Sequence, residues 1–81
     1  MGGLPIALGE IQAIKYARKQ VVDVCGYECV KAYVKGQYNG IVFMAFDNER
    51  IRDLAVHDLR TSKLTIDGAK IWTVPDLPLP I

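Results

Sequence analysis

The stretch "YNGIVFMAF", residues 38–46, combines a turn signal with a strand signal. Asn39-Gly40 is typical of a tight turn, and the apolar run Ile41–Phe46 has the length of a strand rather than of a helix. Side chains alternate between the two faces of a strand, so this strand is apolar on both faces. A fold built around it must account for what covers each face.

The residues before this turn predict its partner strand. Apolar and polar side chains alternate over residues 28–35, with Val30, Ala32 and Val34 on one face. The turn-rich residues 36–40 then join this segment to Ile41–Phe46, which predicts an antiparallel hairpin. We expect Val30, Ala32 and Val34 to point inward, together with Val42, Met44 and Phe46 of the second strand.

Two amphipathic segments flank the hairpin, and both predict helices. They cover residues 7–25 and 47–60, with Gly26 placed to end the first and Asp47 or Asn48 placed to cap the second. The apolar spacing predicts these buried residues: Ile11, Ile14, Ala17, Val21, Val22 and Cys25 in the first helix, and Ile51, Leu54, Ala55 and Leu59 in the second.

The rest of the chain completes an α+β pattern. Residues 64–74 predict an extended segment with a turn at Asp67-Gly68, and the prolines predict an extended tail over residues 75–81. The order is helix, strand, strand, helix, strand, which predicts one domain over residues 1–74 with two helices on one face of an antiparallel sheet. Only a few residues precede the first helix, and Pro5 interrupts them. A strand before that helix is therefore expected to be short or missing.

The composition narrows the function classes. No apolar run is long enough to span a bilayer, so we expect no membrane partner. The two cysteines, Cys25 and Cys29, are expected to be reduced thiols in an intracellular protein, cytoplasmic or nuclear. The lone His57 has no evident catalytic partner, and no phosphate-binding or metal-binding pattern occurs. We therefore expect a non-enzymatic protein without a metal or cofactor.

Residues 39–74 resemble the second half of an RNA recognition motif. The octamer of that family runs basic, Gly, aromatic, Gly or Ala, aromatic, Val, any residue, aromatic. Gly40, Phe43 and Phe46 match it, whereas Asn39 and Ile41 stand where the family has a basic and an aromatic residue. The resemblance implies a ferredoxin-like arrangement that binds single-stranded nucleic acid, RNA above all, on the open sheet face.

The period of two residues identifies the side chains of that open face. If Val42 points inward, the outward-facing residues are Lys31, Tyr33, Lys35, Ile41, Phe43, Lys70 and Trp72. Bases stack on aromatic rings while ammonium groups meet phosphates, so this set suits a single strand. These are the candidate binding residues.

Two other occupants of the same face stay open. An exposed apolar patch also marks protein interfaces, so the domain is alternatively a small interaction or inhibitor domain that dimerises or binds a larger partner. The N-terminal segment or the tail, with Leu77–Ile81, is a third candidate to cover it. The net charge of +1 counts against tight non-specific binding of nucleic acid.

Overall fold

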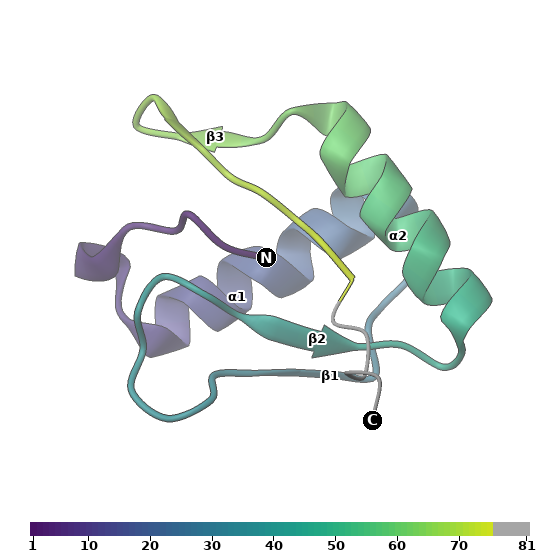
Figure 1. The fold of residues 1–81 in the computed structure, drawn as a ribbon, viewed down its shortest axis with the longest axis horizontal. Coiled ribbons are helices and arrows are strands. Elements are labelled where there is room, and N and C mark those ends of the chain that lie inside the picture. Colours follow the sequence, from purple (N-terminus) through teal and green to yellow (C-terminus); the bar gives the residue numbers. More distant parts are fainter. Residues whose placement is uncertain (76–81) are drawn as a thin grey trace, which may run out of the picture.

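The structure is a computed structural model in which residues 1–75 are described. It is an α+β fold with two α-helices and two small antiparallel sheets (Figure 1). The elements are α1 (Glu10–Gln20), β1 (Lys31–Tyr33), β2 (Phe43–Ala45), α2 (Glu49–Ser62), β3 (Thr65–Ile66) and β4 (Ala69–Lys70). The predicted tail lies, apart from Pro75, outside the described residues.

The predicted hairpin is present, with shorter strands than expected. β1 pairs with β2 so that Tyr33 lies opposite Phe43 and Ala32 lies opposite Met44. The N–H of Val30 still donates to the carbonyl of Ala45 at 2.8 Å, just before β1 begins. The prediction that Val30 points inward is wrong, since it is 61% exposed. It precedes the first residue of the strand, where the alternation of the pleat has not yet begun.

The extended segment Met1–Leu4 lies between β2 and the chain around Trp72. On one side, the N–H of Val42 donates to the carbonyl of Met1 at 2.8 Å, and the N–H of Leu4 donates to the carbonyl of Gly40 at 3.1 Å. On the other side, Gly2 and Trp72 exchange two backbone hydrogen bonds, at 2.8 and 3.0 Å, as an isolated antiparallel bridge. The pairing stops before Pro5, which has no N–H to donate.

Helix α1 buries most of the predicted stripe, since Ala17 and Val21 are core residues and Ile14 and Cys25 pack against them. Its buried residues are Ala13 and Ala17, followed by Val21 in the π-helical turn Val21–Cys25 that ends at Gly26. Ile11 is 68% exposed and Val22 is 43% exposed, so their predicted burial is wrong. Ile11 lies two residues before the buried Ala13, and it points to the other side of the helix because each residue turns a helix by about 100°.

Helix α2 begins two residues later than predicted and is capped as expected. The side chain of Asn48 accepts a hydrogen bond from the N–H of Ile51 at 2.9 Å. Ala55 and Leu59, one turn apart, are its buried residues. The prediction that Leu54 is buried is wrong, because it is 50% exposed. Leu54 directly precedes Ala55 and therefore points away from the stripe that Ala55 and Leu59 define.

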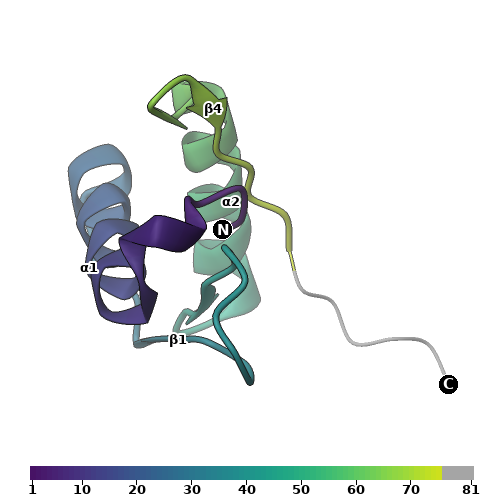
Figure 2. The same cartoon turned by 90° about the vertical axis from the view of Figure 1, so that its left-hand side faces the viewer.

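The core lies between α1, α2 and the extended segments. Its buried members are Met1, Leu4, Ala13, Ala17, Val21, Val42 and Leu59. Figure 2 shows α1 on one side of the molecule and the extended chain that follows β4 on the other, with the N-terminal segment between them. Val21 and Val42 are the largest side chains that are fully buried, whereas Met1, Leu4 and Leu59 each keep a few per cent of exposed surface.

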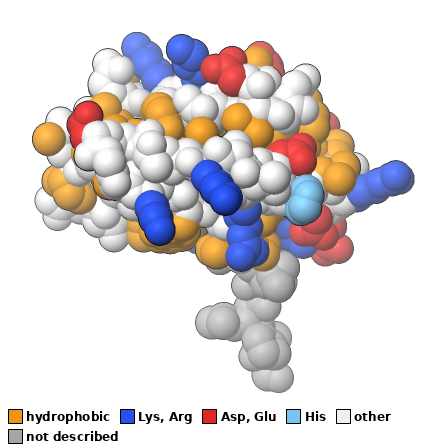
Figure 3. Space-filling model, turned by 90° about the horizontal axis from the view of Figure 1, so that it is seen from above, with side chains coloured by type: hydrophobic (Ala, Val, Ile, Leu, Met, Phe, Trp, Pro, Cys, Tyr) orange, Lys and Arg blue, Asp and Glu red, His pale blue; other side chains and the backbone are white. Residues whose placement is uncertain are grey.

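The surface carries both signs of charge. In the face seen in Figure 3, basic and acidic side chains are interspersed with hydrophobic ones. This agrees with the net charge of +1 for the whole sequence. Among the described residues, no helix has the length and apolarity needed to cross a membrane.

Candidate functional site

Tyr33 and Phe43 form an aromatic pair across the hairpin. They are opposite each other in the register of β1 and β2, and their ring centroids lie 5.8 Å apart with an interplanar angle of 24°. Residues opposite each other in an antiparallel pair bring their side chains together, so the register itself creates the stack. Both residues are half-buried.

Two lysines place their ammonium groups over these rings. Nζ of Lys31 lies 4.8 Å from the centroid of Tyr33, and Nζ of Lys35 lies 4.1 Å from the centroid of Phe43. A cation over a ring face is attracted by the ring quadrupole, and at exposed sites the gain is about 0.5–1 kcal/mol. The hairpin thus holds positive charge directly beside stacked rings.

The strands alternate as the sequence predicts. Val42 is fully buried, and Met44 and Phe46 pack against the same core. Ile41 and Phe43, which fall between them in the chain, are half-buried and do not belong to that core cluster. One face of β2 therefore belongs to the core, and the other face carries Phe43.

Trp72 reaches this region from the C-terminal side of the fold. It is 45% exposed, and its ring lies so close to Gly2 that a methyl group there would collide with the indole. A side chain at Gly3 would come within 2.6 Å of the carbonyl of Lys70, and Gly3 also has a φ of 78°. Two glycines therefore allow the indole to rest on the backbone while much of its surface stays in solvent.

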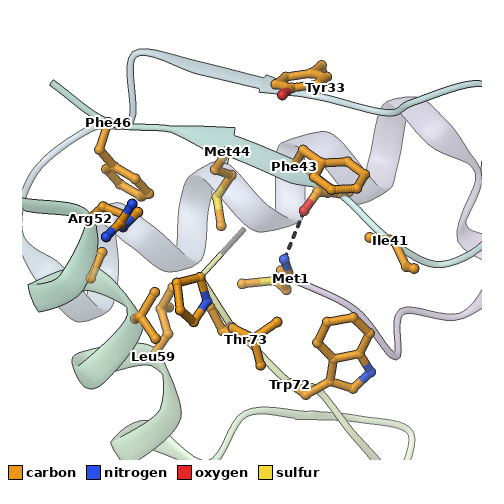
Figure 4. Close-up of a pocket in the computed structure, with 15 residues that line it drawn as sticks. Met1, Tyr33, Ile41, Phe43, Met44, Phe46, Arg52, Leu59, Trp72 and Thr73 are labelled. Atoms are coloured by element: carbon orange, nitrogen blue, oxygen red, sulfur yellow. Dashed lines mark hydrogen bonds between the residues drawn. The ribbon is translucent and has the colours of Figure 1, made fainter. Parts of the chain in front are cut away.

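A pocket of about 310 Å³ lies beside these residues (Figure 4). Tyr33, Ile41, Phe43 and Trp72 line it from the aromatic side. Met1, Val42, Met44 and Thr73 line it from the extended segments, and Arg52, Ala55, Val56 and Leu59 line it from α2. Its walls are mainly apolar. Arg52 contributes a charged side chain, and the N-terminal ammonium of Met1, which donates to the carbonyl of Val42 at 2.8 Å, is a second charged group at the lining.

Arg52 was not among the residues predicted from the sequence. Its side chain is 24% exposed and pairs with Asp53, its neighbour in the chain, at 2.9 Å. Arg52 precedes Ala55 by three residues, so it shares the inward side of α2 with Ala55 and Leu59. The three-residue spacing from Ala55 was the signal in the sequence that Arg52 lies on the inward side of the helix. An arginine at such a position is normally interpreted as solvent-exposed.

Six of the seven predicted site residues lie together, and the seventh lies apart from them. Tyr33, Ile41, Phe43 and Trp72 all line the pocket, and Lys31 and Lys35 contact the two stacked rings. We call these six residues the aromatic face. Lys70 lies exposed on β4 and is not among the pocket-lining residues.

The remaining reactive groups are dispersed. Cys25 and Cys29 are free thiols, and burial raises the pKa of Cys25, with a smaller contribution from the negative charge of Asp58. His57 lines a separate, shallow hollow on α2 together with Asp53 and Arg60. Within residues 1–75, no group of three or more His, Cys, Asp or Glu side chains is arranged to hold a metal ion.

Comparisons with protein-family models, with curated proteins and with solved structures found no match for this chain.

Proposed function

We propose that the protein is a non-enzymatic binding module that takes single-stranded nucleic acid, RNA above all, on the aromatic face. The observation that carries the proposal is the stacked pair Tyr33 and Phe43 with the ammonium groups of Lys31 and Lys35 over its rings. Proteins that bind single strands combine rings on which bases stack with cations that follow the phosphates. Both components lie here on one small hairpin.

Trp72 extends the proposed platform. It lines the same pocket as Phe43, and its 45% exposure leaves ring surface for a further base. Gly2 and Gly3 contribute by presenting backbone where side chains would push the indole away. Each stacked base contributes about 1–3 kcal/mol, so a few rings suffice for moderate affinity with little dependence on the base sequence.

The backbone pairing supports a ferredoxin-like arrangement, which we propose as the finer description of the fold. The hydrogen bonds run from β1 to β2, from residues 40–42 just before β2 to Met1 and Leu4, and between Gly2 and Trp72. If β1, β2, the N-terminal segment and the chain at Trp72 are treated as one layer, the N-terminal segment lies within it as an irregular first strand. In this arrangement both helices cover one side of the layer and the aromatic face lies on the other.

The free thiols support placing this module in a reducing, intracellular compartment.

One observation favours a second function, a protein-interaction domain or homodimer. Trp72 and Val74 are two residues apart in extended chain and are 45% and 55% exposed. Together with Ile41 they give the face an apolar character that also fits a protein partner. Light scattering across a range of concentrations distinguishes the two. A constant monomer mass argues against the dimer, and a mass that doubles argues for it.

The nucleic-acid proposal is tested by fluorescence anisotropy with a labelled, short single-stranded RNA of mixed sequence. Phe43→Leu keeps apolar volume but removes the ring, and we expect it to weaken binding by about 1–3 kcal/mol. Lys31→Gln is expected to lower the dependence of log K on log salt by about 0.7, the share of one phosphate contact. Lys19 is an exposed lysine of α1, and Lys19→Gln is the matched control. It should change neither the affinity for RNA nor the salt dependence of binding.

Two results would refute the proposal. One is the absence of binding at low salt, since the phosphate contacts are strongest there. The other is equal weakening by Lys31→Gln and Lys19→Gln, which would mean that the RNA senses only the net charge.

A further inference from the structure

We propose that the pocket beside the aromatic face is a site for a small apolar carboxylate, such as a medium-chain fatty acid. The volume of about 310 Å³ is at the small end of the range for ligand pockets, which is roughly 300–1,000 Å³. Such sites are mostly apolar, with a few polar groups that fix the orientation of the ligand. The proposal goes beyond nucleic-acid binding. Four residues of the aromatic face line one wall of the pocket, but the groups argued to hold the ligand are Arg52 and apolar residues of α2 and β2.

The apolar part of the site comes from two sides of the fold. Leu59 and Val56 approach from α2, and Met44 approaches from β2. Figure 4 shows Leu59 and Met44 around the same space, with Arg52 at the end of it nearest Phe46. A hydrocarbon chain placed there exchanges contact with water for contact with side chains, which is the main source of affinity for such a ligand.

The guanidinium of Arg52 favours a ligand that carries a negative group. Its Nε and Nη2 atoms both donate to a single oxygen of Asp53, at 3.0 and 2.9 Å. That carboxylate is 63% exposed, so solvent weakens its hold on an arginine that is itself only 24% exposed. A guanidinium has five N–H donors in a planar fork that matches a carboxylate. Arg52 also lies in the first turn of α2, where the helix dipole adds positive potential.

The complementarity therefore favours one occupant, an apolar body with a single negative group. A neutral hydrocarbon would leave the guanidinium without a new partner. A highly charged ligand such as a nucleotide would place several charges against apolar walls, which is costly.

Isothermal titration with octanoate, and with octanol as its uncharged counterpart, tests the site in the full chain. We expect saturable octanoate binding at least about tenfold tighter than that of octanol, because a hydrogen-bonded charge accounts for about this factor. Arg52→Gln should remove the preference for octanoate and leave octanol binding unchanged. Arg50→Gln, an exposed arginine on the same helix, is the matched control and should behave as the unaltered chain.

Circular dichroism confirms that each variant folds, and Val56→Phe provides a second test by filling the pocket without removing charge. Octanoate binding that survives both Arg52→Gln and Val56→Phe would overturn the proposal. The absence of saturable octanoate binding would overturn it as well. Binding that weakens as protein concentration rises would assign the pocket to a second copy and equally overturn it.

The two proposals fail separately. Lys31→Gln should weaken RNA binding without changing octanoate affinity, because Lys31 does not line the pocket. Loss of RNA binding with octanoate binding intact therefore refutes only the nucleic-acid proposal, and the reverse pattern refutes only the pocket.

Discussion

At the scale of single residues, the position of Trp72 depends on a residue without a side chain. The indole lies against Gly2, where a Cβ atom would collide with its ring. Gly2 also exchanges two backbone hydrogen bonds with Trp72, so the backbone that carries the ring is held against Gly2. The glycine thus fixes where the ring lies on the aromatic face.

We predict that Gly2→Ala destabilises the fold by about 1–3 kcal/mol, the usual cost of forcing extra volume into a packed site. The emission of Trp72 should also shift to longer wavelength, because the displaced indole gains contact with water. Urea unfolding gives the first quantity and a fluorescence spectrum gives the second.

Trp72→Leu supplies the control in a double-mutant cycle. In that background, Gly2→Ala should cost much less. An equal cost in both backgrounds would contradict the proposed contact.

The Tyr38 hydroxyl makes stability sensitive to alkaline pH. It donates to the carbonyl of Pro5 at 2.8 Å, and burial raises its pKa above the ordinary value of about 10. Below pH 10 the folded and unfolded chains both keep this proton, so its contribution to stability is complete. As the pH rises through and beyond 10, the unfolded chain loses the proton first, and stability falls.

Tyr38→Phe should therefore lower stability at neutral pH and make the alkaline decline shallower. The neutral cost should be about 1–3 kcal/mol, because the Pro5 carbonyl loses its donor. Urea midpoints measured across the alkaline range test both effects. An unchanged slope above pH 10 would mean that Tyr38 titrates alike in both states.

At the scale of elements, the sequence pattern predicted correctly the strand faces and the turn, which depend on residues close together in the chain. The alternation in β2 placed Val42 in the core and Phe43 on the other face, as the structure has them. The turn at Asp67-Gly68 joins β3 and β4 as predicted. Because these features depend on neighbouring residues in the chain, the local sequence pattern is sufficient to predict them.

Features that depend on distant packing were predicted only in part. In α1 the small Ala13 is buried while Ile11 is exposed, and a hydropathy pattern gives more weight to the larger Ile11. The pairing of Met1–Leu4 with β2 joins segments some forty residues apart, as in the bond between Met1 and Val42. The pocket and Arg52 arise from the same long-range assembly, and therefore neither was predicted.

The start of α2 provides a test at this scale. Asn48 accepts a hydrogen bond from the N–H of Ile51, which would otherwise have no partner within the helix. We predict that Asn48→Ala costs about 1 kcal/mol in unfolding free energy, whereas Asn48→Asp retains the cap. Thermal unfolding of the two variants is the measurement. Equal stability of Asn48→Ala and the unaltered chain would show that this cap contributes nothing.

At the scale of the whole molecule, weak net charge sets the character of the proposed binding. With a net charge of +1 and both signs interspersed on the face in Figure 3, long-range attraction for nucleic acid is small. Binding must then rely on stacking at the aromatic face and on the local charges of Lys31 and Lys35. The affinity should be moderate, with a shallow dependence on salt.

The most direct measurement of this claim is an NMR titration of the isotope-labelled chain with a short single-stranded RNA at low salt. The account predicts that the perturbed amides gather around Tyr33 and Phe43 and around Trp72, while those of α1 stay in place. Perturbations centred on α1, or an unchanged spectrum at saturating RNA, would contradict it.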